Sequence, residues 1–159
     1  MKTLHFEHST LLALPLETVF DFFSKAENLE KLTPPWLRFE ILTPEPIEMG
    51  VGTLLDYRLR IRGLPIRWRG EITTWDPPYV FVDEQRRGPY RFWRHEHRFV
   101  ETSEGVRIED RVEYAVWGGS LIARLFVQPD LRRVFDYRTT RLEEIFSVPA
   151  REKLPSLAG

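Results

Sequence analysis

Apolar and polar side chains alternate along several short stretches of this chain, as they do in strands that bury one face and expose the other. The alternation is clearest within residues 52–63, where charged residues are interleaved with four apolar ones, Leu55, Tyr57, Leu59 and Ile61. Similar stretches occur at residues 3–13, 39–42, 64–75, 79–85, 90–101 and 106–117. Turn-forming residues separate the later ones, at Asp76-Pro77-Pro78, Gly88-Pro89 and Glu104-Gly105. The pattern predicts an antiparallel sheet of about seven strands.

Three other segments have apolar residues at helical spacing. Pro15 opens the first, residues 15–25, and the second, residues 26–36, is expected to end before Pro34-Pro35. The third runs from Ser120 to Phe146, with a break or kink expected at Pro129, which lacks a backbone N–H. One stripe of this long helix contains Leu131, Val134, Phe135, Arg138, Leu142 and Ile145. Residues 148–159 are expected to form a C-terminal tail.

The order of these elements is one strand, two short helices, six strands and one long helix. A single antiparallel sheet must cover its apolar face, and a helix about 40 Å long can lie across a strongly curved sheet. Such an arrangement leaves room for a cavity between sheet and helix. The sequence therefore predicts a single α+β domain over residues 1–147, with a cavity between the sheet and its long C-terminal helix.

Composition excludes several classes of protein. The chain has 159 residues with 42% hydrophobic residues, enough for one folded domain. Its formal net charge of −1 argues against a nucleic-acid partner. The sequence contains no run of 18 apolar residues, so we expect no stable membrane insertion. The chain has no cysteine, so disulfides and thiol nucleophiles are excluded. Polar residues interrupt the N-terminal segment where a signal peptide would be apolar, so we expect a cytoplasmic protein.

Two histidines stand out in the stretch of residues 90–101. His95 and His97 share one face of their predicted strand, together with Trp93. Asp110 is the polar exception in the inward stripe of the next strand, and Arg138 is the polar exception in the stripe of the long helix. Because buried charges are costly unless paired, these side chains are expected to converge between sheet and helix.

Four interpretations of this convergence are open. The cluster could only fix the helix on the sheet, or it could form the polar end of a cavity that orients an amphiphilic ligand. His95, His97 and Asp110 could also act in acid–base catalysis, because a histidine oriented by a carboxylate titrates near neutral pH. A metal site is the least favoured, since no further well-spaced ligand is visible. The faces of Asp83 and Gln85 depend on the length of the loop before Pro89 and stay undecided.

Arginines form a band on two neighbouring strands: Arg58, Arg60, Arg62, Arg67 and Arg69. They could bind an anionic partner or a membrane surface. A solvated sheet face, with cross-strand charge pairs to Asp56 and Glu71, is favoured because the overall charge is balanced.

The order of elements resembles the helix-grip fold of the START-like superfamily, which includes lipid-transfer START domains, plant pathogenesis-related proteins, polyketide aromatase/cyclases and coenzyme Q-binding proteins. Residues 15–23, 28–36, 75–99 and 135–146 are similar to bacterial ligand-binding members of unassigned function. The resemblance covers about residues 2–147. It implies a deep apolar cavity under the C-terminal helix, entered near the N-terminal end of that helix. Leu64, Leu121 and Ile122 would then lie at the entrance.

These observations lead to one expected function and two alternatives. We expect the cavity to bind a hydrophobic or amphiphilic small molecule, such as a lipid, quinone, isoprenoid or polyketide, with no cofactor and no metal. Its expected ligand contacts are Tyr57, Trp68, Trp93, His95, His97, Asp110, Tyr114, Leu125 and Arg138. The alternatives are a polyketide cyclase/dehydratase-type enzyme, or a protein-interaction module with a vestigial cavity. A protein partner or a homodimer stays open.

Overall fold

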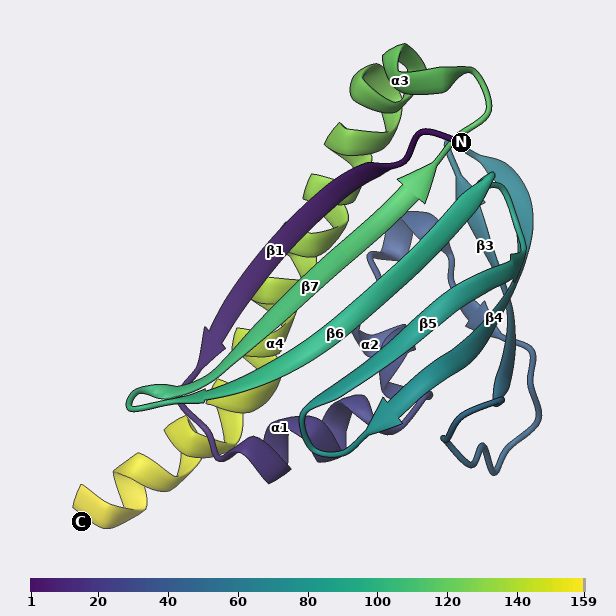
Figure 1. The fold of residues 1–159 in the computed structure, drawn as a ribbon. Helices are drawn as coiled ribbons and strands as arrows, with labels where there is room; N and C mark the ends of the chain where they lie inside the picture. The colour runs from purple at the N-terminus through teal and green to yellow at the C-terminus, as the bar shows by residue number, and fades with distance from the viewer. Residues whose placement is uncertain (159) are drawn as a thin grey trace.

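The fold is one antiparallel sheet closed by a long C-terminal helix (Figure 1). The computed structural model describes the backbone of residues 1–158 and the side chains of residues 1–147. Seven strands form the sheet, in the order β1-β7-β6-β5-β4-β3-β2. Their bounds are β1 (Leu4–Leu12), β2 (Glu40–Ile41), β3 (Leu54–Ile61), β4 (Leu64–Asp76), β5 (Val80–Arg87), β6 (Phe92–Thr102) and β7 (Gly105–Ala115). The predicted α+β helix-grip architecture is confirmed.

The helices lie on the concave side of the curved sheet (Figure 1). Two short ones, α1 (Leu16–Phe23) and α2 (Asn28–Leu32), follow β1 and are succeeded by the 3₁₀ turn η1 (Pro35–Leu37). After β7 the chain forms α3 (Gly119–Ile122), the π-helical turn η2 (Ala123–Val127) and α4 (Gln128–Ala158). Helix α4 continues through residue 158, into the segment 148–159 predicted as a tail. The side chains of this segment, and Gly159 as a whole, lie outside the described residues.

The irregularity expected at Pro129 takes the form of a π turn that ends just before it. A proline has no backbone N–H to donate to the carbonyl four residues earlier, which here belongs to Leu125. In η2 the bonds instead reach back five residues, and the N–H of Gln128 donates to the carbonyl of Ala123. The extra residue in this turn rotates the side chains that follow it relative to an uninterrupted α-helix.

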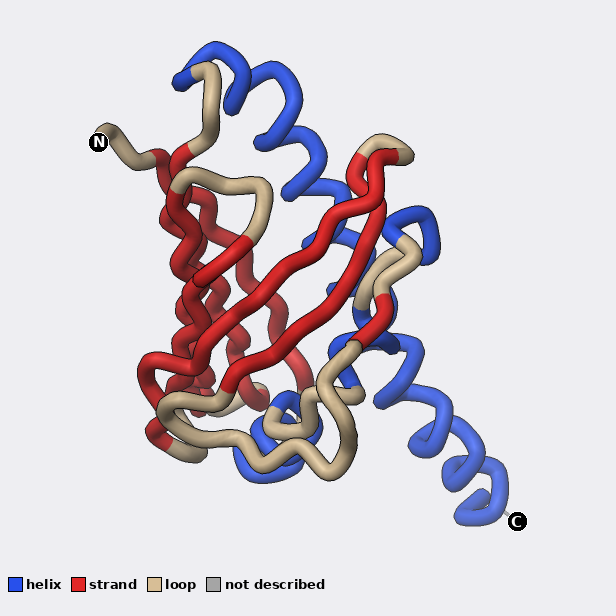
Figure 2. The backbone as a smooth tube through the Cα atoms, turned by 90° about the vertical axis from the view of Figure 1, so that its right-hand side faces the viewer, coloured by secondary structure: helices blue, strands red, loops and turns tan. Residues whose placement is uncertain are grey.

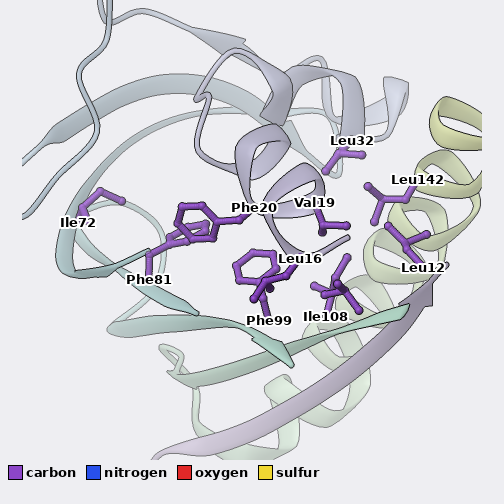
Figure 3. Close-up of a cluster of buried hydrophobic side chains, with 11 residues drawn as sticks. Leu12, Leu16, Val19, Phe20, Leu32, Ile72, Phe81, Phe99, Ile108 and Leu142 are labelled. Atoms are coloured by element: carbon purple, nitrogen blue, oxygen red, sulfur yellow. The ribbon is translucent and has the colours of Figure 1, made fainter. Parts of the chain in front are cut away.

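The apolar core is divided between the two ends of the helix-grip. At one end, Leu16, Val19 and Phe20 of α1 point toward Phe81 and Phe99 on the sheet (Figure 3). At the other end, a second cluster forms between β7, β1 and the start of the long helix and contains Val112, Tyr114, Ala123, Leu131 and Phe135. Both clusters bury the apolar stripes predicted from sequence spacing.

The strand directions place several loops together at one end of the molecule. Because all neighbouring strands are antiparallel, the β3–β4 hairpin, the β5–β6 loop and the β7–α3 connection lie at the same end as the N-terminus (Figures 1 and 2). Helix α1 lies near the opposite end (Figure 1). No helix among the described residues is both long and apolar enough to span a membrane.

Candidate functional site

A cavity of about 560 Å³ lies between the sheet, α2 and the long helix. Its wall is mostly apolar and aromatic, with side chains from β3, β4, β5, β6, α2 and α4. Six of the residues predicted as ligand contacts line it: Tyr57, Trp68, Trp93, His95, His97 and Arg138. The predicted cavity between sheet and helix is therefore present in this fold.

The other predicted site residues do not line the cavity. Asp110 and Tyr114 are buried, and Asp110 lies behind the wall, bonded to His95. Leu125 is largely exposed instead, and its neighbours Phe126 and Val127 line the cavity. Continued backward from Leu131 at 3.6 residues per turn, the buried stripe of the long helix reaches Val127 and not Leu125. The predicted entrance residues are exposed outside the lining: Leu64, Leu121 and Ile122.

The two histidines form two hydrogen-bonded pairs with carboxylates. His95 Nε2 lies 2.8 Å from Asp110 Oδ1, and His97 Nε2 lies 2.6 Å from Asp83 Oδ2. An ionised carboxylate only accepts hydrogen bonds, so both imidazoles donate from Nε2. The two rings lie 3.6 Å apart between centroids, and Phe81 stacks on His97 at 4.1 Å. We call Asp83, His95, His97, Asp110 and Arg138 the polar cluster.

Asp83 joins the cluster because of the strand register. It pairs with His95 across β5 and β6, and Phe81 pairs with His97, so odd-numbered residues of both strands face the helix. Gln85 closes the β5–β6 connection instead, donating to the carbonyl of Tyr90 and accepting from its N–H. The face left undecided by the sequence is set by the odd number of residues, 85–93, between the last paired residues of the two strands, Glu84 and Arg94.

Burial and hydrogen bonding fix the charge states in the cluster. Burial disfavours the charged form of both aspartates, but the histidine hydrogen bonds and the charge of Arg138 outweigh it and hold the pKa of Asp83 and Asp110 below the ordinary range. Burial, together with the neighbouring His95, lowers the pKa of His97 to about 4. At neutral pH, His97 is therefore a neutral imidazole between two carboxylates.

Arg138 brings a positive charge into the cavity wall. Its side chain is nine-tenths buried, and its guanidinium carbon lies 5.2 Å from the centre of the Phe135 ring. Among the described side chains, no carboxylate lies within 4.0 Å of its nitrogens. The arginine therefore balances Asp83 and Asp110 at longer range, and its donors face the cavity without a direct ionic partner.

The geometry favours hydrogen-bonded pairs over a metal centre. Asp83, His95 and His97 bring one ligand atom each within 4.8 Å of one another and are the residues that could hold a cation. However, the 2.6 Å between His97 and Asp83 is shorter than the roughly 3.3 Å that separates two tetrahedral zinc ligands at about 2.0–2.1 Å from the metal. The cationic Arg138 next to them also disfavours a second positive charge.

The structure adds residues that the sequence patterns missed. Tyr90 lines the cavity beside Trp68 and Trp93. Because it follows a loop, strand alternation alone did not predict which side of the sheet it faces. Burial raises the pKa of both Tyr57 and Tyr90, so their hydroxyls stay neutral. Their position indicates that one end of the cavity is lined by aromatic rings with polar atoms at their edges.

A chain of hydrogen bonds anchors the long helix to β1 beside the cluster. His8 Nε2 lies 2.7 Å from the hydroxyl of Thr139, which lies 2.6 Å from the hydroxyl of Thr10. Both β1 residues belong to the inward face of their strand, with Phe6 between helix and sheet. Because this chain satisfies its own polar groups, its role is structural.

Arg62 closes one side of the cavity mouth. It lies on the β3–β4 hairpin, and its guanidinium donates to Asp130 at 3.1 Å and lies 5.1 Å from the centre of the Phe126 ring. All three residues contribute to the lining. Of the predicted cross-strand pairs of the arginine band, the one to Asp56 forms, because Arg69 binds both of its carboxylate oxygens. Glu71 pairs instead with Arg86, and Arg58 pairs with Glu40.

Comparison with solved structures shows the same fold in proteins of different kinds. A protein from Nitrosomonas europaea, NE0264, has a TM-score of 0.69 at 16% identity, covering 94% of this chain and 96% of its own. The ZhuI aromatase/cyclase from Streptomyces sp. R1128 also has a TM-score of 0.69 at 16% identity, covering 88% and 91%. Norcoclaurine synthase from Thalictrum flavum has a TM-score of 0.65 at 19% identity, covering 90% and 96%.

Sequence comparison identifies the family. No curated protein sequence matches this chain. The model of the family described as polyketide cyclase/dehydrase and lipid transport matches residues 12–143, which run from the end of β1 to the middle of α4 and enclose every residue of the polar cluster. With its helix-grip fold and internal cavity, the chain belongs to the polyketide cyclase/dehydrase and lipid transport family.

Proposed function

We propose that the protein binds a hydrophobic or amphiphilic small molecule, of the size of a lipid, quinone, isoprenoid or polyketide, in the cavity under its long helix. The observation that carries this proposal is a mostly apolar cavity of about 560 Å³ whose wall contains Asp83, His95, His97 and Arg138 of the polar cluster. Ligand sites of small molecules typically have volumes of about 300–1,000 Å³ and few polar groups. Burial of the ligand's apolar surface supplies most of the affinity, at about 25 cal/mol per Å² before the costs of binding.

The polar cluster sets the orientation of such a ligand. Asp83, His95, His97 and Arg138 all contribute to the lining, and they lie on the wall formed by the middle of the sheet and α4. A ligand oxygen placed there can accept from the guanidinium of Arg138, and a ligand hydroxyl can donate to Asp83. The apolar body of the ligand then extends toward Leu55, Leu59 and Leu32.

Native mass spectrometry of the purified protein tests the proposal directly. We expect an adduct of a few hundred daltons that is lost under denaturing conditions, and its mass identifies the bound molecule. A protein that carries no adduct, and that also fails to bind the neutral apolar dye N-phenyl-1-naphthylamine, would contradict the proposal.

Filling the cavity should abolish this binding. Gly70 lines the cavity on β4, and a β-carbon added there would meet its nearest atoms only at 3.8 Å, so Gly70→Leu places a side chain in the cavity with little strain. We expect affinity for N-phenyl-1-naphthylamine to fall by about tenfold or more. Gly50→Leu adds the same side chain where no atom lies within 4 Å and serves as the matched control. Equal affinities of the two variants would show that the dye binds elsewhere.

Acid–base catalysis is a second candidate, favoured by the His97–Asp83 pair in the cavity wall. With Nε2 donating to Asp83, Nδ1 is the atom of His97 that would take a proton from a substrate and return it. This atom is buried and has no hydrogen-bond partner among the described residues, so catalysis requires a substrate that reaches it. For an enzyme, incubation of the protein with the molecule recovered from it should change the mass of that molecule. His97→Gln should then stop the conversion while binding persists. Recovery of the molecule unchanged after long incubation would favour binding alone.

A further inference from the structure

Apolar side chains are concentrated at the end of the molecule where Arg62 and Phe126 line the cavity. Five of them are 44–68% exposed: Leu64, Trp117, Leu121, Leu125 and Phe126. They come from the β3–β4 hairpin and from the connection that leads through α3 into η2 (Figures 1 and 2). Leu121 and Leu125 lie four residues apart across α3 and η2, and Trp117 precedes this helix, separated from it by Gly118 in the left-handed conformation. An exposed apolar surface of this kind marks a site of contact with a protein or a membrane.

Arginines surround this apolar surface. Residues 60–64, 86–91 and 117–126, which form the hairpin tip, the β5–β6 loop and the start of the helix, contain no acidic residue and six arginines: Arg60, Arg62, Arg86, Arg87, Arg91 and Arg124. We call these three segments the tip. Two of these arginines pair with carboxylates outside the tip, Arg62 with Asp130 and Arg86 with Glu71. The other four have no carboxylate within 4.0 Å among the described side chains, so the tip carries unpaired positive charge in a chain whose formal net charge is −1.

Contacts between the three segments hold the tip together as one surface. The guanidinium of Arg91 in the β5–β6 loop lies 5.4 Å from the centre of the Trp117 ring. Arg62 of the hairpin lies 5.1 Å from the centre of the Phe126 ring and donates to Asp130 in the first turn of α4. Since Arg62 and Phe126 also line the cavity, whatever covers the tip faces the cavity mouth.

We propose that the tip docks on the surface of a lipid bilayer that contains anionic lipids. Exposed Trp, Leu and Phe side chains partition into the interfacial region of a bilayer, and nearby arginines are attracted to an anionic surface. The side chains stand on a hairpin and a helix end, which can enter a fluid interface. The docked protein would exchange its ligand with the bilayer, and this exchange rests on the function proposed above. The docking itself does not depend on that function.

Vesicle sedimentation tests the docking. The full chain is mixed with vesicles of phosphatidylcholine alone, or of phosphatidylcholine with one quarter phosphatidylglycerol. We expect sedimentation with the anionic vesicles, weaker binding at high salt, and a loss of at least about tenfold in affinity for the Leu121→Glu/Leu125→Glu variant. A matched control, Leu11→Glu/Val51→Glu, changes two exposed residues outside the tip and should bind like the unaltered chain.

Three outcomes would overturn docking: no binding to anionic vesicles, equal loss in both double variants, or unchanged binding in the tip variant. Analytical ultracentrifugation identifies one rival, because a dimer that only the tip variant disrupts would show that a second copy of the chain covers the tip. Dye binding by N-phenyl-1-naphthylamine is measured on the same samples. Vesicle binding without dye binding would refute the proposed function and leave the docking intact. Dye binding without vesicle binding would refute the docking and leave the proposed function intact.

Discussion

Replacing Asp110 with alanine is expected to lower the free energy of unfolding by about 3–5 kcal/mol, the cost of removing one partner from a buried charged pair. The carboxylate is 5% exposed and accepts a hydrogen bond from His95 Nε2 at 2.8 Å. Its loss leaves that donor without an acceptor and removes one of the two negative charges that balance Arg138. Urea unfolding at pH 7, followed by circular dichroism, measures the difference.

A neighbouring residue provides the control for this variant. Glu109 lies on the same strand but on the solvent side, where it pairs with Arg107 at 2.9 Å. Exposed pairs contribute about 0–1 kcal/mol, so Glu109→Ala should have a small effect. Similar costs for both variants would contradict a structural role for the buried pair. Asp110→Asn keeps an acceptor near His95 without the charge and separates the hydrogen-bond contribution from the charge contribution.

The sequence predicted the centre of the site because polar residues interrupted otherwise apolar stripes. Asp110 stands between Ile108 and Val112 on the inward face of its strand, and Arg138 interrupts the stripe of the long helix. A charged residue at such a position must be buried with partners, so its approach to the histidines could be inferred without knowing the fold in detail.

Features that depend on a one-residue shift could not be predicted in the same way. Asp83 faces the cluster only because the length of the connection between β5 and β6 places it opposite His95. A connection one residue longer or shorter would turn it to the other face. Leu125 was expected in the cavity, but it is exposed, because the buried stripe of the long helix, continued backward at 3.6 residues per turn, reaches Val127. The sequence did not determine this phase, because the break expected at Pro129 separated Leu125 from that stripe.

Lowering the pH from about 6.5 to about 4 should reduce the free energy of unfolding by about 3 kcal/mol through His97 alone. Burial lowers the pKa of His97 to about 4 in the folded protein, against 6.5 for an ordinary histidine. The unfolded chain therefore binds the proton first, and acid favours unfolding across this window. Asp83 and Asp110 act with the same sign at lower pH: the stability from their depressed pKa values is complete above about 3.8 and is lost as the pH falls below it toward their folded pKa.

Urea unfolding at a series of pH values from 7 to 4.5 measures this loss, and His97→Gln isolates its source. The glutamine cannot titrate, so we expect a flatter pH dependence in that variant above pH 4.5. His5→Gln, at an exposed position on β1, should keep the slope of the unaltered chain. Equal slopes in all three proteins would mean that His97 binds its proton at the same pH in the folded and the unfolded chain, which would contradict a pKa lowered by burial.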